Sequence, residues 1–443
     1  MLIKFEVENW LSFRERICFT MLSTRERQHG ERIARLPRYG TVKVLPIAAI
    51  YGGNASGKTN FFKAIHFVRE LVLKSSRPEV PIGVQPFRLE AEAANKPSSF
   101  LIQVLANEVI YEFSFVVTAT SVIEEKLVSL GRTADKVLYH RKDGQIKLAS
   151  SLPDQDFLTF AFNGTQDNQL FLTNSVQQKG RQFQPVYSWF RNNLRLIAPD
   201  SRFAAFDLFI EKGSFINENV NKLLPALDTG IDRLGGEEIP FANLAIPDEL
   251  RDDIRKETPD GGVIKLRIEP QNDCYLVRRN GNDFKARKLV TFHNMNDGGE
   301  EKFDMVNESD GSQRVIDLLP AFLAVSDRAA QKVFIIDELD RSLHTLLTRQ
   351  LLEAYLAECG ADSRAQVLFT THDLLLMDQS LLRRDEMWLV ERDRQGASSL
   401  IPLSDFNSDI RYDKDIRKSY LQGRMGGMPK IHPMLSFQAV DKD

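Results

Sequence analysis

The sequence has little that would suit an extracellular, membrane or zinc-binding protein. Its three cysteines, Cys18, Cys274 and Cys359, are widely separated and form no C-x-x-C pair, so neither a zinc ribbon nor a disulfide framework is expected. No apolar run has the roughly 20 residues needed to cross a bilayer. The opening residues, MLIKFEVENW, alternate like a β-strand and lack the apolar core of a signal peptide. We therefore expect a cytoplasmic protein without membrane contact.

The chain also lacks a strong excess of either charge. Its net charge is −3 over 443 residues, and its 42% hydrophobic content is typical of a globular protein with two or three domains. One segment differs, because residues 14–43 contain eight cations and three glutamates. These cations are Arg14, Arg16, Arg25, Arg27, Arg32, Arg35, Arg38 and Lys43. Two interpretations stay open, a solvated loop or a patch that binds nucleic acid.

A glycine-rich stretch, 51-YGGNASGKTNFF-62, has the spacing G-x-x-x-x-G-K-[ST]. The apolar run before it predicts a buried strand, and the apolar spacing after it predicts a helix. In such a loop the backbone N–H groups and the helix start cradle phosphates, the lysine reaches the β- and γ-phosphates, and the next hydroxyl holds Mg²⁺. The alternative is a glycine turn with an incidental lysine. We predict that ATP contacts Gly52, Gly53, Asn54, Ala55, Ser56, Gly57, Lys58, Thr59 and Asn60, with Thr59 also a metal ligand.

Two adjacent carboxylates follow a second apolar run in 333-VFIIDELDRSLH-344. Open α/β sheets bind their ligands at the carboxyl ends of the strands, where these side chains would emerge. Asp337 would hold Mg²⁺ through a water molecule, and Glu338 would polarise the water that attacks the γ-phosphate. The alternative is an ordinary strand end.

A histidine ends the next apolar run, 367-VLFTTHDLLL-376. His372 could donate a hydrogen bond to a γ-phosphate and so report whether that phosphate is present. On its own, a histidine in this position could equally be structural. The presence of the two preceding motifs favours the functional interpretation.

A second device for binding anions is predicted in 308-ESDGSQR-314. Ser309 supplies a hydroxyl, Gly311 an unobstructed backbone N–H, and a helix is expected to begin there. An ordinary helix cap is the alternative. One site seldom needs two helix N-termini from a single chain, so two copies arranged head to tail would each lend this segment to the other's nucleotide.

Together these motifs resemble those of the ABC-type ATPases, in the branch that contains the SMC and RecF proteins. More narrowly, the chain resembles the RloA- and AbiL-type ATPases of bacterial abortive-infection loci, and it is also similar to the ATPase of the PARIS system. The strings that carry this resemblance are 8-ENWLSFRE-15, 50-IYGGNASGKTNFFKAI-65, 308-ESDGSQRVIDLLP-320, 334-FIIDELDRSLH-344, 369-FTTHDLLLMD-378 and 420-YLQGRMGGMP-429.

The resemblance implies an α/β fold, an ABC-type P-loop ATPase head with a β-rich N-terminal lobe and a parallel, RecA-like core sheet. Residues 1–130 would form the first part of this head. Amphipathic stretches at 185–197 and 215–228 favour an inserted, mostly helical lobe with some strands over residues 131–300. Residues 301–443 would complete the head. A coiled-coil arm is not expected, because no heptad pattern is sustained.

For the site, the resemblance implies ATP and Mg²⁺ bound between two protomers, with higher oligomers left open. Lys58, Glu338 and His372 would be catalytic within one protomer, whereas Ser309 and Gly311 would come from the partner. Residues 342–344 match the D-loop, which crosses the dimer seam. The signature departs from the family pattern, because Asp310 adds a negative charge, and Pro320 should kink the helix after it. No clear Q-loop is present, and Gln85 and Gln103 are weak candidates.

Two functions follow from the resemblance. Related OLD nucleases carry a C-terminal Toprim nuclease domain, but only 71 residues follow His372, so a separately encoded effector, Toprim-like or related, is expected. The first function is thus an ATPase switch in anti-phage defence that responds to a phage protein or DNA. The second is a DNA-repair clamp similar to RecF or SMC proteins. An ABC transporter subunit is a weaker third possibility, because it needs a membrane partner.

Overall fold

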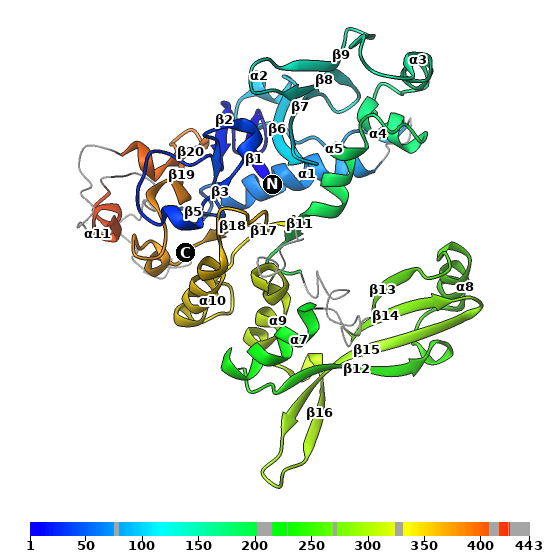
Figure 1. Cartoon of the computed structure of the whole chain (residues 1–443), viewed down its shortest axis with the longest axis vertical. Coiled ribbons are helices and arrows are strands. Elements are labelled where there is room, and N and C mark those ends of the chain that lie inside the picture. The colour runs from blue at the N-terminus through cyan, green and yellow to red at the C-terminus, as the bar shows by residue number, and fades with distance from the viewer. Residues whose placement is uncertain are drawn as a thin grey trace, which may run out of the picture.

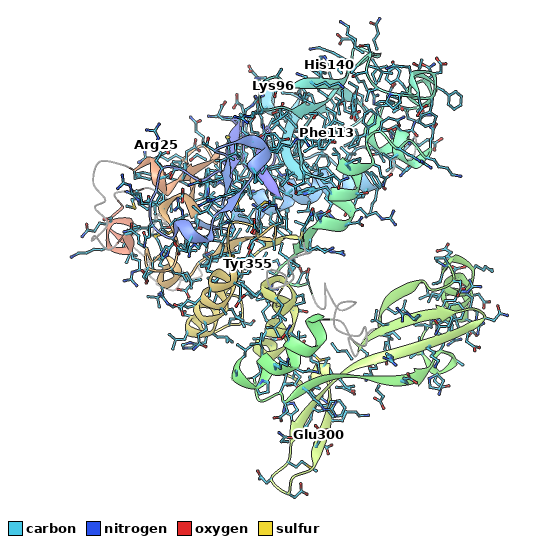
Figure 2. All side chains as sticks on the ribbon, viewed as in Figure 1. Arg25, Lys96, Phe113, His140, Glu300 and Tyr355 are labelled. Carbon is cyan, nitrogen blue, oxygen red and sulfur yellow. The ribbon has the colours of Figure 1, made fainter. Side chains whose placement is uncertain are left out.

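The computed structural model describes residues 1–74, 79–201, 215–227, 229–268, 273–323, 331–406, 416–423 and 425. Most of these residues form two stacked sheets with helices, and a third sheet stands beside them (Figure 1). Figure 2 shows Phe113 and Tyr355 within the packed side chains of the larger body. In the part of the chain that the structure describes, no helix is both long and apolar enough for a membrane span.

The first sheet is antiparallel and has seven strands in the order β10-β9-β8-β7-β6-β1-β2. Burial alternates along β1 and β6, because one face packs on the core and the other faces water. The strands are β1 (Leu2–Glu8), β2 (Ile17–Thr20), β6 (Ser98–Ala106), β7 (Val109–Val117), β8 (Val122–Leu130), β9 (Lys136–Lys142) and β10 (Gln145–Leu148). Strands β6 and β7 pair from Ser98 to Val117, and Asp143 and Gly144 connect β9 to β10.

The second sheet has six strands in the order β11-β17-β18-β5-β19-β20, and all neighbours are parallel except β19 and β20. Its strands are β5 (Ile47–Tyr51), β11 (Leu194–Ile197), β17 (Val333–Ile336), β18 (Gln366–Thr371), β19 (Met387–Arg392) and β20 (Ser398–Pro402). The runs of β5 and β17 are apolar throughout, because both faces of this sheet are covered. The predicted strands at 47–50, 333–336 and 367–369 are confirmed.

Helices cover the two faces of this second sheet. Helix α1 (Lys58–Leu73) shares one hydrophobic core with the first sheet, so it lies between the two sheets. Helices α9 (Asp310–Leu323) and α10 (Thr345–Glu358) share the other core with the opposite face. Pro320 lies inside α9, which continues to Leu323. Strand order and helix layers confirm the predicted α/β fold class.

Short helices connect the two sheets between residues 155 and 193. They are α3 (Gln155–Asn163), α4 (Phe171–Gln177), α5 (Gln184–Ser188) and a π-helix (Trp189–Asn193). The amphipathic stretch 185–197 is therefore helical only to Asn193, and its last four residues are β11. Further short elements are α2 (Ala91–Ala94), α11 (Ile416–Leu421) and the pair β3 (Ala34–Arg35) and β4 (Lys43–Val44). The string 420–429 lies largely outside the described residues.

The third sheet corrects the expected organisation of residues 131–300. Residues 233–304 form an antiparallel sheet in the order β12-β15-β14-β13, with β16 paired to β15, so a mostly helical lobe is wrong for this part. The elements are α7 (Phe215–Leu223), β12 (Arg233–Pro240), α8 (Asp248–Glu257), β13 (Val263–Ile268), β14 (Asp273–Asn280), β15 (Asp283–Asn294) and β16 (Glu300–Asp304). Figure 1 shows α7 and α9 between this sheet and the rest of the molecule. The division into domains remains a prediction.

The basic segment 14–43 is partly neutralised in the folded chain. Arg32 is buried and donates to Glu386 at 2.5 Å, and Arg16 pairs with Glu8 at 2.9 Å. Burial raises the pKa of Glu386 to about 7, although Arg32 opposes this effect. Five other cations of the segment are exposed, namely Arg25, Arg27, Arg35, Arg38 and Lys43. Both interpretations of the segment therefore stay open.

Candidate nucleotide site

The phosphate loop joins the end of β5 to the start of α1. Two of its residues have positive φ, Ala55 at 57° and Gly57 at 121°, so the backbone folds back on itself. A Cβ atom at Gly52 would lie 2.5 Å from the carbonyl oxygen of Val390, and one at Gly57 would lie 2.6 Å from the Ser398 hydroxyl. Glycine is therefore required at both positions by close packing, and at Gly57 also by its φ. The loop therefore packs against β19 and β20.

Lys58 points into this loop rather than into solvent. Its Nζ donates to the carbonyl oxygens of Gly52 at 2.7 Å and Gly53 at 3.0 Å. The same Nζ lies 3.3 Å from Nδ1 of His372, at the end of β18. Burial lowers the pKa of Lys58 to about 8, against the opposing effect of Asp337 and its acidic neighbours. An anionic phosphate group in the loop would favour the charged form of this lysine.

Asp337 is a fully buried carboxylate with one satisfied and one unsatisfied oxygen. Its Oδ1 accepts a hydrogen bond from the Thr370 hydroxyl at 2.6 Å. Its Oδ2 has no hydrogen-bond partner among the residues that the structure describes. A buried carboxylate oxygen without a donor is costly, and a cation is the kind of partner that would offset this cost.

Glu338 follows directly and turns away from the strand. Its φ is 51°, and its backbone N–H donates to the Thr370 hydroxyl at 2.8 Å. Its side chain is half-buried. The positive φ of a residue other than glycine is uncommon and costs of order 1 kcal/mol or more. The local backbone is thus held in a conformation that separates the two carboxylates.

His372 lies where the ends of β17 and β18 meet the phosphate loop. Its backbone N–H donates to the Asp340 carboxylate at 3.3 Å. Burial, followed by the nearby Lys58, lowers the pKa of His372, so its imidazole is neutral at pH 7. A neutral ring beside the lysine can donate one hydrogen bond to a phosphate oxygen while it accepts another.

The donors around this corner suit Mg²⁺. Thr59 at the start of α1 offers a hydroxyl and Asp337 offers the unsatisfied oxygen, and oxygen ligands are those that Mg²⁺ prefers. Across the described residues, no group of three or more His, Cys, Asp or Glu side chains could form a complete metal cage. Mg²⁺ is commonly held by one or two protein carboxylates together with substrate phosphates.

Ser309 and Gly311 lie at the N-terminus of α9. The Ser309 hydroxyl accepts from the backbone N–H of Ser312 at 3.1 Å, so the predicted helix cap is present. A Cβ atom at Gly311 would lie 2.9 Å from the carbonyl oxygen of Ser342. This close contact places the α9 N-terminus against the segment that follows the acidic pair, which matches the D-loop.

A cavity of about 430 Å³ lies at this contact. Its lining comes from the residues before β12, the start of α9 and the start of α10. The lining residues are Ala226, Leu227, Thr229, Ser309, Gly311, Ser312, Val315, Ser342, Leu343, His344, Leu346, Leu347 and Gln350. None of them belongs to the phosphate loop or is acidic. Lys58, Asp337, Glu338 and His372 therefore do not line the cavity that Ser309 and Gly311 line.

The segment before Ser309 is tied to the third sheet. Glu308 accepts hydrogen bonds from His293 Nε2 at 2.7 Å and from the Thr291 hydroxyl, both on β15. The Ser312 hydroxyl donates to the Thr229 carbonyl, just before β12, at 3.3 Å. A movement of this sheet would therefore displace the start of α9.

Three residues of the site escaped the sequence analysis, Thr370, Asp340 and Arg314. The first two hold Asp337 and His372, as described above. Arg314 is buried in α9, and its Nη2 donates to the carbonyl oxygens of Asp337 at 3.1 Å and Glu338 at 3.0 Å. The two threonines before His372 were a visible signal for Thr370. No comparable signal marked Arg314 in the sequence, because a cation on a helix normally indicates a face exposed to solvent.

The two Q-loop candidates differ in position. Gln103 lies on β6 and donates to Glu112 on β7 at 2.8 Å, so it belongs to a cross-strand pair. Gln85 is exposed, and its carbonyl oxygen accepts from Leu11 in the string 8–15 at 2.8 Å. The same string contacts the phosphate loop, because Ser12 accepts from Asn60 at 2.8 Å. The position of a Q-loop stays open.

Comparison with known proteins gives one family and a number of similar solved structures, among them two SMC heads. Residues 47–378 match a family described as "AAA domain, putative AbiEii toxin, Type IV TA system". No curated protein matches the chain. The SMC head domain from Thermotoga maritima is 14% identical with a TM-score of 0.36, over 90% of this chain and 98% of that one. The SMC head bound to the C-winged helix domain of ScpA is 12% identical with a TM-score of 0.41, over 91% and 99%. Because both TM-scores are low, the fold assignment rests on strand order and on the family.

Proposed function

The chain belongs to this AAA domain family, whose match spans more than half of its length, and we propose that it binds and hydrolyses ATP as a dimer. One observation carries this proposal. Lys58, His372 and the unsatisfied oxygen of Asp337 gather where parallel strands end, against a loop that has glycine where close packing requires it. A lysine, a hydroxyl and a buried carboxylate at such an edge suit a Mg²⁺-bound triphosphate.

Each residue of this corner has a separate task in the proposed reaction. Backbone N–H groups of residues 52–60 bind the phosphates, and Lys58 contacts the β- and γ-phosphates. Mg²⁺, held by Thr59 and by Asp337 through a water molecule, would neutralise charge on the phosphates. Glu338 orients and polarises the attacking water. His372 donates to the γ-phosphate and contacts Lys58, so it reports the hydrolysis state to the end of β18.

The second half of the proposed site comes from the partner protomer. Ser309 and Gly311 line a cavity without carboxylates, at the N-terminus of a long helix. Helix N-termini favour anions, and this one does not share its cavity with its own phosphate loop. In a head-to-tail dimer, the γ-phosphate bound to one chain would meet Ser309 and Gly311 of the other. Asp310 would lie beside that phosphate and weaken the attraction.

We further propose that this ATPase is a switch in bacterial anti-phage defence. Its support is the resemblance to RloA-, AbiL- and PARIS-type ATPases and the family description, which names a toxin of a toxin–antitoxin system. In this proposal ATP closes the dimer, and a phage protein or DNA changes its hold on a separately encoded nuclease, Toprim-like or related. The third sheet, through its contact with Glu308, is the surface that we assign to this partner.

A co-expression experiment tests the switch. The chain and the product of its neighbouring gene are expressed together, and survival after phage challenge is measured for the natural sequence and for Lys58→Ala. We expect protection to disappear in the variant. If the variant protects as well as the natural sequence, ATP does not control the defence.

The runner-up is a DNA clamp like the RecF and SMC proteins. Its support is the set of exposed cations in the basic segment, among them Arg25 and Arg27, and Figure 2 shows Arg25 at the edge of the molecule. A clamp would bind duplex DNA with an affinity that falls steeply with salt. Filter binding over a salt series separates the two functions. Salt-dependent binding of the isolated chain that is lost in Arg25→Gln/Arg27→Gln would favour the clamp.

A further inference from the structure

One stretch of the chain has cations and no acidic residue. Between Asp167 and Asp200 the sequence contains Lys179, Arg181, Arg191 and Arg195 and neither aspartate nor glutamate. The chain as a whole has slightly more acidic than basic residues, 61 against 58. This stretch runs through α4, α5, the π-helix and β11, so its positive charge is concentrated in one part of the fold.

A cavity of about 690 Å³ opens in this stretch. Its lining includes two cations, four carboxamides and no carboxylate. The lining residues are Ala106, Asn107, Lys179, Gly180, Arg181, Gln184, Pro185, Ser188, Trp189, Asn193 and Gln331. Binding sites for small molecules are clefts of roughly 300–1,000 Å³, and the volume of this cavity lies within that range.

Its two cations are available to a ligand. Lys179 and Arg181 are exposed, and neither side chain forms an ion pair or hydrogen bond with any residue in the described ranges. Nearby Arg141 differs, because it is buried and lies 3.6 Å from Glu125. The closest acidic residue along the lining segments is Glu108, whose carboxylate lies 4.0 Å from Arg364. The field in the cavity is therefore positive.

The remaining wall is held rigidly and retains hydrogen-bonding capacity. The Asn193 side chain donates to the Gln331 carbonyl at 2.7 Å, and Gln184 donates to the Ser188 hydroxyl at 2.9 Å. Trp189 is 1% exposed, and its indole N–H has no partner in the part of the chain that the structure describes. Gly180 is fixed between Ser175 and Phe157, because a Cβ there would lie 2.6 Å from the Ser175 carbonyl oxygen.

This cavity is separate from the nucleotide site. Asn193 and Gln331 precede the parallel strands β11 and β17, whereas Asp337 follows β17. Strands of four residues span roughly 13 Å. The cavity therefore lies at the N-terminal ends of these strands, and the nucleotide site lies at their C-terminal ends. A ligand here would leave the phosphate loop free.

We propose that this cavity is a second anion site that binds the phosphate groups of a nucleotide-sized ligand. The guanidinium of Arg181 offers a planar fork that matches two phosphate oxygens, and the ammonium of Lys179 adds a point charge. The carboxamides of Asn107 and Gln184 supply donors and acceptors for a base or a sugar. The phosphate could belong to a free nucleotide or to the end of a nucleic-acid strand.

Equilibrium binding to the full chain tests this proposal. All proteins carry Lys58→Ala, so that the phosphate loop contributes little. The test variant adds Lys179→Gln/Arg181→Gln, and the matched control adds Lys136→Gln/Lys147→Gln, two exposed cations of the first sheet. Calorimetry with pyrophosphate and fluorescence anisotropy with a labelled, 5′-phosphorylated single-stranded dT10 measure affinity. Thermal melting checks that the exposed substitutions leave the fold intact.

We expect the test variant to lose about tenfold or more in affinity for at least one probe, and the control to keep its affinity. For dT10, the slope of log affinity against log salt should fall by about 1–2, because two phosphate contacts are removed. Strong dT10 binding with weak pyrophosphate binding would assign the site to nucleic acid, and the reverse to a free nucleotide. Equal affinities in test and control proteins mean an adventitious ion only and overturn the proposal. Single variants Lys179→Gln and Arg181→Lys decide the matter if the double variant is unstable.

Discussion

The two halves of the candidate nucleotide site differ in how they are built within one chain. The phosphate-loop half is compact, because Lys58 lies 3.3 Å from His372 and Asp337 lies 2.6 Å from Thr370, which is on the strand that ends directly before His372. The signature half, Ser309 and Gly311, lines another cavity and is tied through Glu308 to the third sheet. From this difference we infer that ATP binding depends on the phosphate-loop half alone. Completion of the site depends on the signature half, which a movement of the third sheet would displace.

The largest effect is expected from the compact half. Lys58→Ala removes a side chain that reaches both the loop carbonyls and His372, so ATP binding and hydrolysis should fall by about a hundredfold or more. Nucleotide affinity and steady-state hydrolysis are measured. Lys63→Ala, an exposed lysine on the same helix, is the control and should change neither. Equal losses in both variants would contradict a specific role for Lys58.

Glu338→Gln should stop hydrolysis while ATP stays bound. The amide cannot accept a proton from water, and removal of a general base costs about 10²–10⁴ in rate. The variant should therefore accumulate as an ATP-bound dimer on a sizing column. The natural sequence without nucleotide is the reference, and it must elute as a monomer for the test to be informative. A variant that stays monomeric with ATP argues against closure by nucleotide.

Ser309→Arg tests the signature half of the site. The bulky cation fills the cavity at the start of α9, so hydrolysis should be lost while the affinity of one chain for ATP is kept. Ser309→Asn is the matched control, because asparagine also caps a helix well. Full activity of Ser309→Arg would mean that the segment with Ser309 and Gly311 takes no part in hydrolysis.

Thr370→Val tests the link between the two carboxylates. The hydroxyl donates to Asp337 and accepts from the Glu338 N–H, and loss of a buried partner costs about 1–3 kcal/mol. We expect a lower melting temperature and a weaker response of hydrolysis to Mg²⁺, and Thr370→Ser should restore both. An unchanged Mg²⁺ dependence in the valine variant would mean that Thr370 only supports the fold.

The smallest effect is expected from His293→Gln, which weakens the contact of the third sheet with Glu308. Hydrolysis should change a few-fold, with ATP affinity unchanged, because the substitution affects only the signature half of the site. His140→Gln is the control, since His140 contacts Glu124 within the first sheet. A change in ATP affinity that matches the change in rate would contradict the proposed division between the halves.

The sequence predicted the compact half well for a physical reason. Its residues follow short apolar strands in continuous motifs, so local spacing is enough to place Lys58, Asp337 and His372 at strand ends. Thr370 was missed because its role depends on the register of β17 against β18, where Ile336 pairs with Phe369. Arg314 was missed because its burial depends on how α9 packs against β17.

For the third sheet, the sequence predicted only some strands within a helical lobe, and its first strand, β12, was missed because its local signal is weak. Strand β12 reads RLGGEEIP, with two glycines and a proline that indicate a break rather than a strand. Its pairing with β15, from Arg233 opposite Phe292 to Pro240 opposite Lys285, supplies the order that local sequence does not. The helical pattern at the start of 215–228 was real and forms α7, but α7 flanks this sheet instead of forming a lobe.

A mixing experiment tests the central claim, that each site combines halves from two chains. The Lys58→Ala and Ser309→Arg variants are each expected to be inactive on their own. Equal amounts of the two variant proteins are mixed and allowed to exchange subunits. A mixed dimer then contains one site with both halves intact, so about a quarter of the natural hydrolysis rate should return. Exchange is verified with differently tagged chains. If the mixed dimers form and the mixture stays inactive, the site is not shared between chains and the account is wrong.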